Sequence, residues 1–302
     1  MREKAVICYG EVLWDHLPAG KSPGGAPMNV AYHLHKLGIN SHLVSSVGND
    51  GAGKELLEFL QGVGLPTQQV QTDANHATSE VIASMNEQKE VTYQIVAPVA
   101  WDFIQWNPAI MPLIQQADAI VFGSLSSRGN HSKTTLFRML EHAKYRVFDV
   151  NLRAPFYSAE LISQLLEKCD LVKLNTDELQ LIAEWNHTAS ENEADLVALL
   201  FKKYNITEVL ITKGSQGATY YNTSGKYNSP AYKIQVADTI GSGDSFLAAF
   251  LAMKLMGKPI EEVLDVAVAM GAFITSQAGA CPEYSKSDFE AFRQRHNFYN
   301  SK

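Results

Sequence analysis

Short apolar runs alternate with amphipathic segments along most of this chain, and that alternation is the feature that most constrains its fold. Six runs rich in Val, Ile or Leu predict buried parallel strands, at residues 4–10, 41–48, 118–124, 145–151, 169–175 and 207–214. Amphipathic patterns predict helices at residues 28–37, 54–61, 133–144, 159–167, 195–203, 242–255, 260–276 and 286–295. This order predicts an α/β fold with a mostly parallel, doubly wound central sheet and helices on both faces.

One segment interrupts the alternation. Residues 81–85 and 91–96 are two β-rich runs around a polar turn, and they predict a hairpin outside the main sheet. Open α/β sheets bind ligands at the carboxyl ends of their strands, so we expect a small β-sheet lid there. We expect one domain over residues 1–302, with the lid formed mainly from about 11–18 and 78–99.

Composition excludes several classes of protein. The net charge is −7 and no basic stripe is present, which argues against a nucleic-acid partner. No apolar run reaches the roughly 20 residues that span a membrane, and the first residues do not resemble a signal peptide. The 3 cysteines are widely spaced and suit a reducing compartment, so we expect a cytoplasmic protein.

The segment VGNDGAGKE, residues 47–55, fits part of the phosphate-binding pattern G-x-x-x-x-G-K. That pattern needs Ser or Thr next, because the hydroxyl ligates Mg²⁺, and this chain has Glu55. Gly and Asn also suit an ordinary turn. We therefore favour a strand-to-helix turn, with Lys54 solvated in the first turn of the helix.

A better phosphate site lies in VADTIGSGDSFLAAFLAMKL, residues 236–255. Gly241 and Gly243 permit backbone conformations that direct consecutive N–H groups at one point, at the start of a long helix. The helix dipole there favours an anion. Asp244 would lie beside a bound phosphate, where it suits a group that accepts a proton during the reaction. The alternative, that Asp244 merely caps the helix, is equally compatible with this stretch alone.

The stretch DTIGSGDSF resembles the C-terminal signature of the ribokinase-like (PfkB) sugar kinases, usually D-T-x-G-A-G-D, with Ser242 in place of Ala. The resemblance implies a ribokinase-like three-layer α/β/α fold with a small β-sheet lid. It also implies that Asp244 is the general base and that the amides of Gly241, Ser242 and Gly243 form the anion hole.

Two further stretches resemble the acceptor side of the same family. SPGGAPMNVAYHLHKLG, residues 22–38, is similar to the fructokinase form of the N-terminal signature. It implies that Gly24, Gly25 and Asn29 bind the sugar, together with Asp15 in GEVLWDHLP. Taken singly, these residues also fit a glycine turn, an ordinary helix start and a solvated loop carboxylate.

Three stretches resemble the nucleotide side. FDVNLRAPF resembles the fructokinase D-x-N-x-R, which implies that Arg153 lies near the transferred phosphoryl group. KLNTDEL matches N-x-x-E, which implies that Asn175 and Glu178 bind Mg²⁺ through water, although the same spacing is a capping box. TKGSQG matches a turn that contacts ATP, and the residues implied are Thr212, Lys213, Gly214 and Gly217.

The chain also departs from the family pattern. Val268 replaces an Asn near the adenine, and VAPVAWDFI lacks the Ala-Asp signature of fructokinase lids. Members activated by K⁺ use the positions of Asp238 and a loop near Gly279, but Glu283 replaces a frequent Ser there. A K⁺ site is therefore left open.

The resemblance implies an ATP-dependent kinase that uses Mg²⁺ and phosphorylates a small sugar, with fructose as the expected acceptor. A kinase of another sugar or of a nucleoside, and a sugar sensor without turnover, are the alternatives. Since an exposed lid edge would need a cover, we also expect a homodimer formed partly through residues 81–96.

Overall fold

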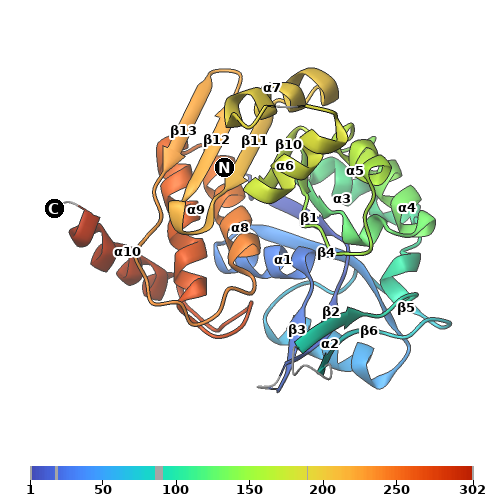
Figure 1. Ribbon diagram of the computed structural model, residues 1–302. Helices are drawn as coiled ribbons and strands as arrows, with labels where there is room; N and C mark the ends of the chain where they lie inside the picture. The colour runs from blue at the N-terminus through green and yellow to red at the C-terminus, as the bar shows by residue number, and fades with distance from the viewer. Residues whose placement is uncertain (1, 18–19, 86–90, 189, 301–302) are drawn as a thin grey trace.

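In the computed structural model, which describes residues 2–17, 20–85, 91–188 and 190–300, nine strands form one large sheet (Figure 1). Their spatial order is β13 (Gly225–Ser229), β12 (Ala218–Asn222), β11 (Glu208–Thr212), β10 (Leu171–Asn175), β9 (Arg146–Asp149), β8 (Ala119–Gly123), β1 (Ala5–Tyr9), β4 (Asn40–Gly48) and β5 (Val70–Asp73). The pairs from β5 through β11 are parallel, whereas β12 and β13 form an antiparallel hairpin.

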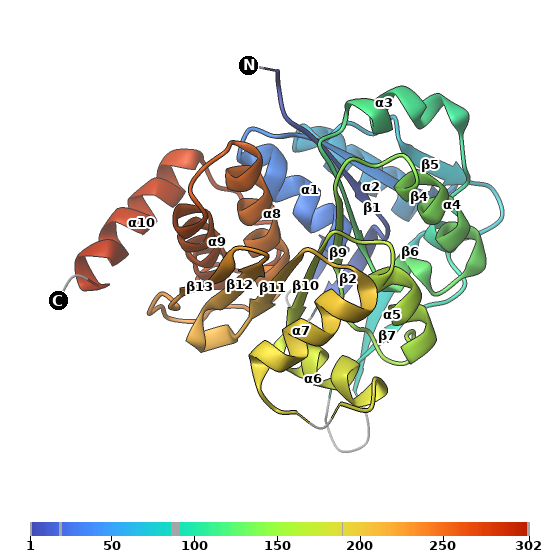
Figure 2. The same cartoon turned by 90° about the horizontal axis from the view of Figure 1, so that it is seen from above.

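Helices cover both faces of this sheet, because side chains along each strand alternate between two apolar clusters. Val147 and Leu171 belong to the first cluster, and their neighbours Phe148 and Val172 belong to the second. The first cluster includes α1 (Ala26–Lys36), α2 (Gly51–Gly62), α8 (Ser242–Leu255), α9 (Ile260–Thr275) and α10 (Lys286–Asn300). The second includes α3 (Met111–Gln116), α4 (Asn130–Leu140), α5 (Ala159–Leu166), α6 (Thr176–Trp185) and α7 (Glu193–Tyr204). The two layers are separated by the sheet in Figure 2, which confirms the predicted three-layer arrangement.

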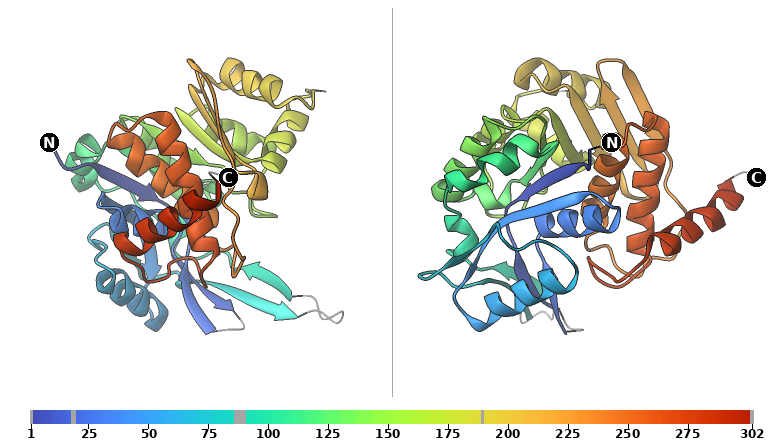
Figure 3. Two further views of the ribbon diagram at one scale, coloured as in Figure 1. Left: turned by 90° about the vertical axis from the view of Figure 1, so that its left-hand side faces the viewer. Right: turned by 180° about the vertical axis from the view of Figure 1, so that it is seen from behind.

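A second sheet projects from the body of the molecule (Figure 3). Its strands lie in the order β3 (Gly20–Gly24), β2 (Leu13–Leu17), β6 (Ser79–Met85) and β7 (Val91–Ile95), and we call it the lid sheet. The β6–β7 hairpin was predicted from the sequence, but its turn lies outside the described residues. Strand β3 was not predicted, since its Gly and Pro residues suggest a turn.

Some elements escaped prediction because they are short or polar. They are β5, β12, β13, α3 and four 3₁₀ turns: η1 (Ala100–Phe103), η2 (Pro108–Ile110), η3 (Leu125–Ser127) and η4 (Gly214–Gln216). Of α6, only the start was predicted, from its capping pattern. Asn222 supplies the β12–β13 turn, since its side-chain oxygen accepts hydrogen bonds from the amides of Ser224 and Gly225. Within the described part of the chain, no helix combines the length and hydropathy needed to cross a bilayer.

Candidate active site

The predicted phosphate loop lies at the amino end of α8. Gly241 is the N-cap residue with φ of 74°, and a Cβ there would come within 2.7 Å of the Ala280 Cα, so only glycine fits. Gly243 does not have the expected left-handed backbone; it lies in the first helical turn. The amides of this turn have no partner within the helix. The Ser242 amide donates to the Thr239 carbonyl at 3.3 Å, so the Gly241 and Gly243 amides are the ones left free for an anion at the end of the helix dipole.

Asp244 lies at the third position of α8, so the alternative that it is the N-cap is wrong. Its side chain is buried, and its Oδ2 accepts a hydrogen bond of 2.7 Å from the Asn29 Nδ2. Burial, reinforced by the nearby charge of Asp149, raises the pKa of Asp244 to about 6. The pKa of this carboxyl group suits a proton acceptor near neutral pH.

Asn29 connects Asp244 to the chain near the C-terminus. It lies on α1, which packs directly against α8, and its Oδ1 accepts a hydrogen bond of 3.3 Å from the Cys281 thiol. The sequence predicted a sugar ligand here. The structure places one amide N–H on the predicted base, and the other amide N–H has no partner among the described residues.

Asp15 and the two predicted glycines lie together where β2 pairs with β3 and β3 leads into α1. Asp15 is half-buried on β2, and β3 pairs with β2 so that a side chain at position 24 would overlap the Asp15 carboxylate. Gly25 has φ of 114°, and a side chain there would overlap the backbone of Glu11. Burial raises the pKa of Asp15 to about 6, and the positive charge of Arg153 opposes that rise.

The prediction from sequence missed Glu11, whose side chain is buried and whose Oε2 has no hydrogen-bond partner among the described residues. Burial raises the pKa of Glu11 to about 7, with Arg153 and Asp244 both near enough to affect it. The only available signal was its position two residues after the end of β1. Arg153, by contrast, was predicted. It is exposed, and its positive charge stabilises the ionised forms of Glu11, Asp15 and Asp244.

A second feature missed from the sequence is a buried ion pair beneath the phosphate loop. Lys173 on β10 lies 2.8 Å from Asp149 on β9, as measured from Nζ to Oδ1. A Cβ on Gly243 would sit 3.3 Å from the same Nζ. The signal available was a charged residue within a strand that is otherwise apolar, which is rarely buried without a function or a partner.

Asn175 and Glu178 form the capping box of α6, as the alternative reading predicted. The Asn175 side chain accepts from the Glu178 amide at 2.8 Å, and the Glu178 Oε2 accepts from the Asn175 amide at 2.8 Å. The other oxygen of Glu178 accepts from the Leu152 amide at 2.9 Å. Each carboxylate oxygen still has a lone pair for a water molecule.

No group of three or more His, Cys, Asp or Glu residues that could hold a metal ion occurs among the described residues. Mg²⁺ that arrives with nucleotide phosphates needs only one or two carboxylates and keeps several waters. The free lone pairs of Glu178 and the unpartnered Oδ2 of Asp149 fit that requirement.

The predicted nucleotide turn follows β11. Thr212 pairs with Asn175 across the parallel strands, so the two predicted segments end side by side. The Lys213 amide donates to the Gly217 carbonyl at 2.8 Å, which closes a turn in which Gly214 has φ of 53°. The Lys213 ammonium lies 2.5 Å from Glu193 on α7. Its side chain is therefore directed toward α7.

The two residues predicted for a K⁺ site are in contact. The Asp238 Oδ2 accepts a hydrogen bond of 3.1 Å from the Gly279 amide, and its Oδ1 accepts one of 3.0 Å from the Ile240 amide. Asp238 therefore ties the loop after α9 to the segment that leads into α8. The cation itself stays a prediction.

The segment of residues 47–55 is a strand-to-helix turn. Asp50 is the N-cap of α2, and its side chain accepts from the Gly53 amide at 2.7 Å and from the Thr78 amide at 2.8 Å. The Lys54 side chain is 79% exposed and is 3.8 Å from Glu58 on the same helix. This confirms the turn and the solvated lysine.

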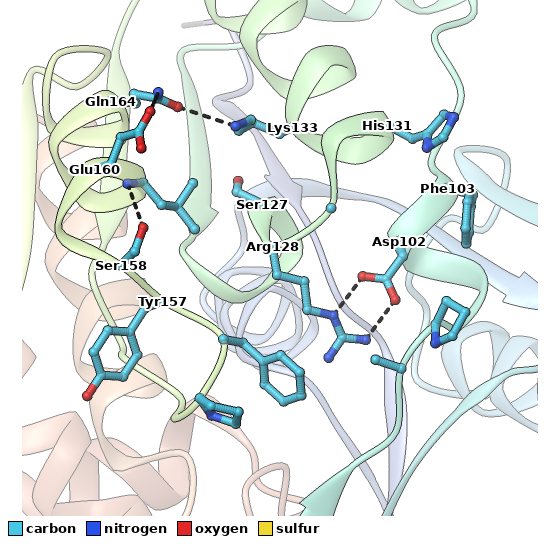
Figure 4. Close-up of a pocket in the computed structure, with 16 residues that line it drawn as sticks. Asp102, Phe103, Ser127, Arg128, His131, Lys133, Tyr157, Ser158, Glu160 and Gln164 are labelled. Carbon is cyan, nitrogen blue, oxygen red and sulfur yellow. Dashed lines mark hydrogen bonds and ion pairs between the residues drawn. The ribbon is translucent and has the colours of Figure 1, made fainter.

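A cavity of about 700 Å³ lies where the lid sheet joins the body (Figure 4). Arg128 and Asp102 line this cavity, and Arg128 donates hydrogen bonds of 2.7 Å to both carboxylate oxygens of Asp102. It also donates to the Val96 carbonyl at 2.9 Å, directly after β7. Aromatic rings of Trp101 and Phe156 lie over its guanidinium. This buried cluster fixes the end of the lid sheet to the body.

Comparison with known proteins agrees with this geometry. The profile of a family described as pfkB family carbohydrate kinase matches residues 8–286. The probable fructokinase-5 of Arabidopsis thaliana is 28% identical over 308 residues, which cover 92% of this chain and 93% of that protein.

Solved structures share the fold. A fructokinase from Xylella fastidiosa with bound ATP superposes with a TM-score of 0.86 at 20% identity, over 98% of this chain and 100% of that chain. A double mutant of the fructokinase from Vibrio cholerae O395, bound to fructose, ADP and a potassium ion, superposes with a TM-score of 0.82 at 24% identity, over 96% of this chain and 98% of that chain. The predicted ribokinase-like fold is confirmed.

Proposed function

Because the chain belongs to the pfkB family of carbohydrate kinases, we propose that it transfers the γ-phosphoryl group of ATP to a primary hydroxyl group of fructose. One observation carries the assignment: the buried carboxylate of Asp244 lies in the first turn of α8, beside the amides of Gly241 and Gly243, which have no backbone partner among the described residues. A proton acceptor and an anion site are thereby adjacent, as phosphoryl transfer to an alcohol requires.

The acceptor sugar is held between the lid sheet and α1. Asp15 accepts hydrogen bonds from two hydroxyl groups, and the free amide N–H of Asn29 donates to a third. Gly24 and Gly25 let the backbone pass close to Asp15 and Glu11, because a side chain at either position would overlap those residues. Closure of the lid sheet over the sugar excludes water from the reacting groups.

The nucleotide lies along the carboxyl ends of β10 and β11. Backbone groups of Thr212, Lys213, Gly214 and Gly217 contact ATP, and Asn175 and Glu178 hold the waters of Mg²⁺. Bound Mg²⁺ neutralises charge on the phosphates. The amides of Gly241, Ser242 and Gly243 bind the oxygens of the γ-phosphoryl group.

The reaction forms one bond and breaks another. The sugar hydroxyl oxygen bonds to the γ-phosphorus while the bond from that phosphorus to the bridging oxygen of ADP breaks, and Asp244 accepts the hydroxyl proton. Arg153 and the amides of the loop stabilise charge on the equatorial oxygens. Positioning and electrostatics dominate, because the transition state is loose. The base itself contributes about 10²–10⁴ in rate.

A sugar panel tests the proposal. ATP consumption is measured with fructose, ribose, ribitol and adenosine, and fructose is expected to give the highest kcat/KM. The fructose assignment rests on GGAPMNVA and DVNLR. A tenfold preference for another acceptor overturns fructose but keeps the kinase. No ATP consumption with any acceptor supports the alternative of a sensor, against which the intact Asp244 and glycine loop argue.

Three further assignments belong to this proposal. The contact between Asp238 and Gly279 supports a K⁺ site, and the Vibrio cholerae protein was solved with a potassium ion. The enzyme acts in the cytoplasm, as its cysteines suggest. It acts as a homodimer through the lid sheet, whose outer strands β3 and β7 have unpaired edges within the described residues.

A further inference from the structure

The buried ion pair beneath the phosphate loop has a role that family membership does not assign. Lys173 and Asp149 are partners in the parallel register of β10 and β9. Each lies two residues after an apolar residue, Leu171 or Val147, of the cluster that includes α8. Side chains two apart on a strand share a face, so the sheet directs both charges toward the amino end of α8.

The pair is almost completely buried, and its hydrogen bonding is incomplete. The exposed fractions of the two side chains are 8% for Lys173 and 4% for Asp149. Asp149 is the only hydrogen-bond partner of the lysine ammonium among the described residues, although the ammonium has three donors. The Oδ2 of Asp149 has no partner in the same set. Buried polar groups are nearly always satisfied, so this pair is built for a further polar group.

Gly243 leaves the ammonium open toward the loop. A Cβ at this position would lie 3.3 Å from the Lys173 Nζ and would cover it. The backbone of Gly243 lies in the first helical turn, where any residue could follow the same path. The requirement for glycine is therefore the approach of the lysine rather than the backbone conformation.

We propose that the ammonium of Lys173 contacts the γ-phosphoryl group of ATP from the sheet side, and that Asp149 positions the ammonium. This rests on the proposed function. The amides of residues 241–243 bind the phosphoryl oxygens from one side and Lys173 binds them from below, beside Asp244. A buried ion pair stabilises a fold no better than an apolar pair of the same size, so stability alone does not account for it.

A single and a double variant distinguish a contact between Lys173 and the phosphoryl group from a purely structural role of the ion pair. Lys173→Met alone leaves the Asp149 carboxylate buried without its partner and is expected to lower the melting temperature. The double variant Lys173→Met/Asp149→Asn removes both charges and should recover most of that loss. Its kcat should stay 10²–10³-fold below that of the wild type, as when one donor to a developing oxyanion is removed.

The matched control uses the same two strands. Arg146, the first residue of β9, and Asp170, directly before β10, form a partly exposed ion pair of 2.5 Å at the other end of these strands. The double variant Arg146→Met/Asp170→Asn should change kcat by less than about twofold.

Binding affinity gives a second measurement. The double variant Lys173→Met/Asp149→Asn should bind a nonhydrolysable ATP analogue at least tenfold more weakly than the wild type does. Its affinity for ADP should stay within about twofold, because only the analogue has a γ-phosphoryl group.

The outcomes are distinct. A double variant with kcat within fivefold of the wild type, or with equal loss of affinity for the ATP analogue and ADP, overturns the contact. If the variants fail to fold, wild-type protein with ¹⁵N-labelled lysine decides: a buried ammonium signal should shift with the ATP analogue and not with ADP, and an unmoved signal overturns the contact. If the wild type phosphorylates no sugar yet the affinity difference appears, the proposed function fails and the contact stands.

Discussion

The Nδ2 of Asn29 donates a hydrogen bond of 2.7 Å to the Oδ2 of Asp244, although 215 positions separate the two residues in the chain. This bond links α1, on the proposed sugar side, to α8, on the proposed phosphate side. It also lowers the pKa of Asp244 against the effect of burial. The residue proposed to bind the sugar therefore also favours the ionised form of the proposed base.

Replacing Asn29 should change the pH dependence of the reaction. Asp244 must be ionised to accept a proton, so wild-type kcat/KM should fall as the pH drops below about 6. In Asn29→Leu the carboxylate loses its donor, which favours the protonated form. The acid limb should move up by about one pH unit. Cys281→Ala, which removes only the thiol behind Asn29, is the control, and an unmoved limb in Asn29→Leu contradicts the coupling.

Asp244→Asn should remove the base without removing the fold. Asp244 does not cap α8, and an Asn oxygen can still accept from Asn29, so ATP affinity should stay within about twofold. The loss in kcat should be about 10²–10⁴, because the amide cannot accept the sugar proton. Single-turnover kinetics and ATP titration measure the two effects, and a fully active variant would remove Asp244 from the mechanism.

The Glu11→Gln variant should become more stable relative to the wild type as the pH rises. The pKa of Glu11 is raised to about 7 from 4.5, so the folded wild type binds more protons than the unfolded chain between those values and loses stability as the pH increases through them. Gln cannot ionise and avoids this loss. Urea denaturation at pH 5 and pH 8 should show the variant gaining on the order of 3 kcal/mol relative to wild type. Glu58→Gln, at an exposed position of α2, should show no such trend.

The lid sheet should mediate dimerisation. Strand β6 is paired on both sides, so the available edge of the predicted hairpin is β7, with β3 at the other end of the sheet. Light scattering at micromolar concentration should give twice the mass of 33.3 kDa. A proline at position 22 of β3, which cannot donate in a strand ladder, should weaken the dimer if β3 is the interface. A monomeric wild type refutes the prediction.

The sequence predicted the central sheet, most of its helices and the glycine loop, and it led us to Asp244, but the buried charges of Glu11, Lys173 and Asp149 were not predicted. The bounds of α8 were predicted at residues 242–255 as observed, because its apolar residues and glycine start are local signals. The roles of Glu11, Lys173 and Asp149 depend on which strands are neighbours and on which face each side chain lies, and neither is written in a local pattern. Glycine was expected at position 243 because of a left-handed backbone, but the backbone there is helical. The structure gives a different reason for glycine, which is the close approach of the Lys173 ammonium.

The two candidate phosphate loops can be separated by substitutions in each. If residues 48–54 bound phosphate, Lys54→Ala would abolish turnover. Because the Lys54 side chain is 79% exposed and its ion pair among the described residues is with Glu58 on the same helix, we expect kcat to change by about twofold at most. Gly243→Val places a branched side chain against the Lys173 ammonium and among the amides of the loop, so ATP affinity and kcat should both fall at least tenfold. Ala52→Val, on the turn of the rejected loop, is the matched control and should leave ATP affinity unchanged. An inactive Lys54→Ala beside an active Gly243→Val would move the phosphate site to residues 48–54 and overturn the assignment of Asp244 with it.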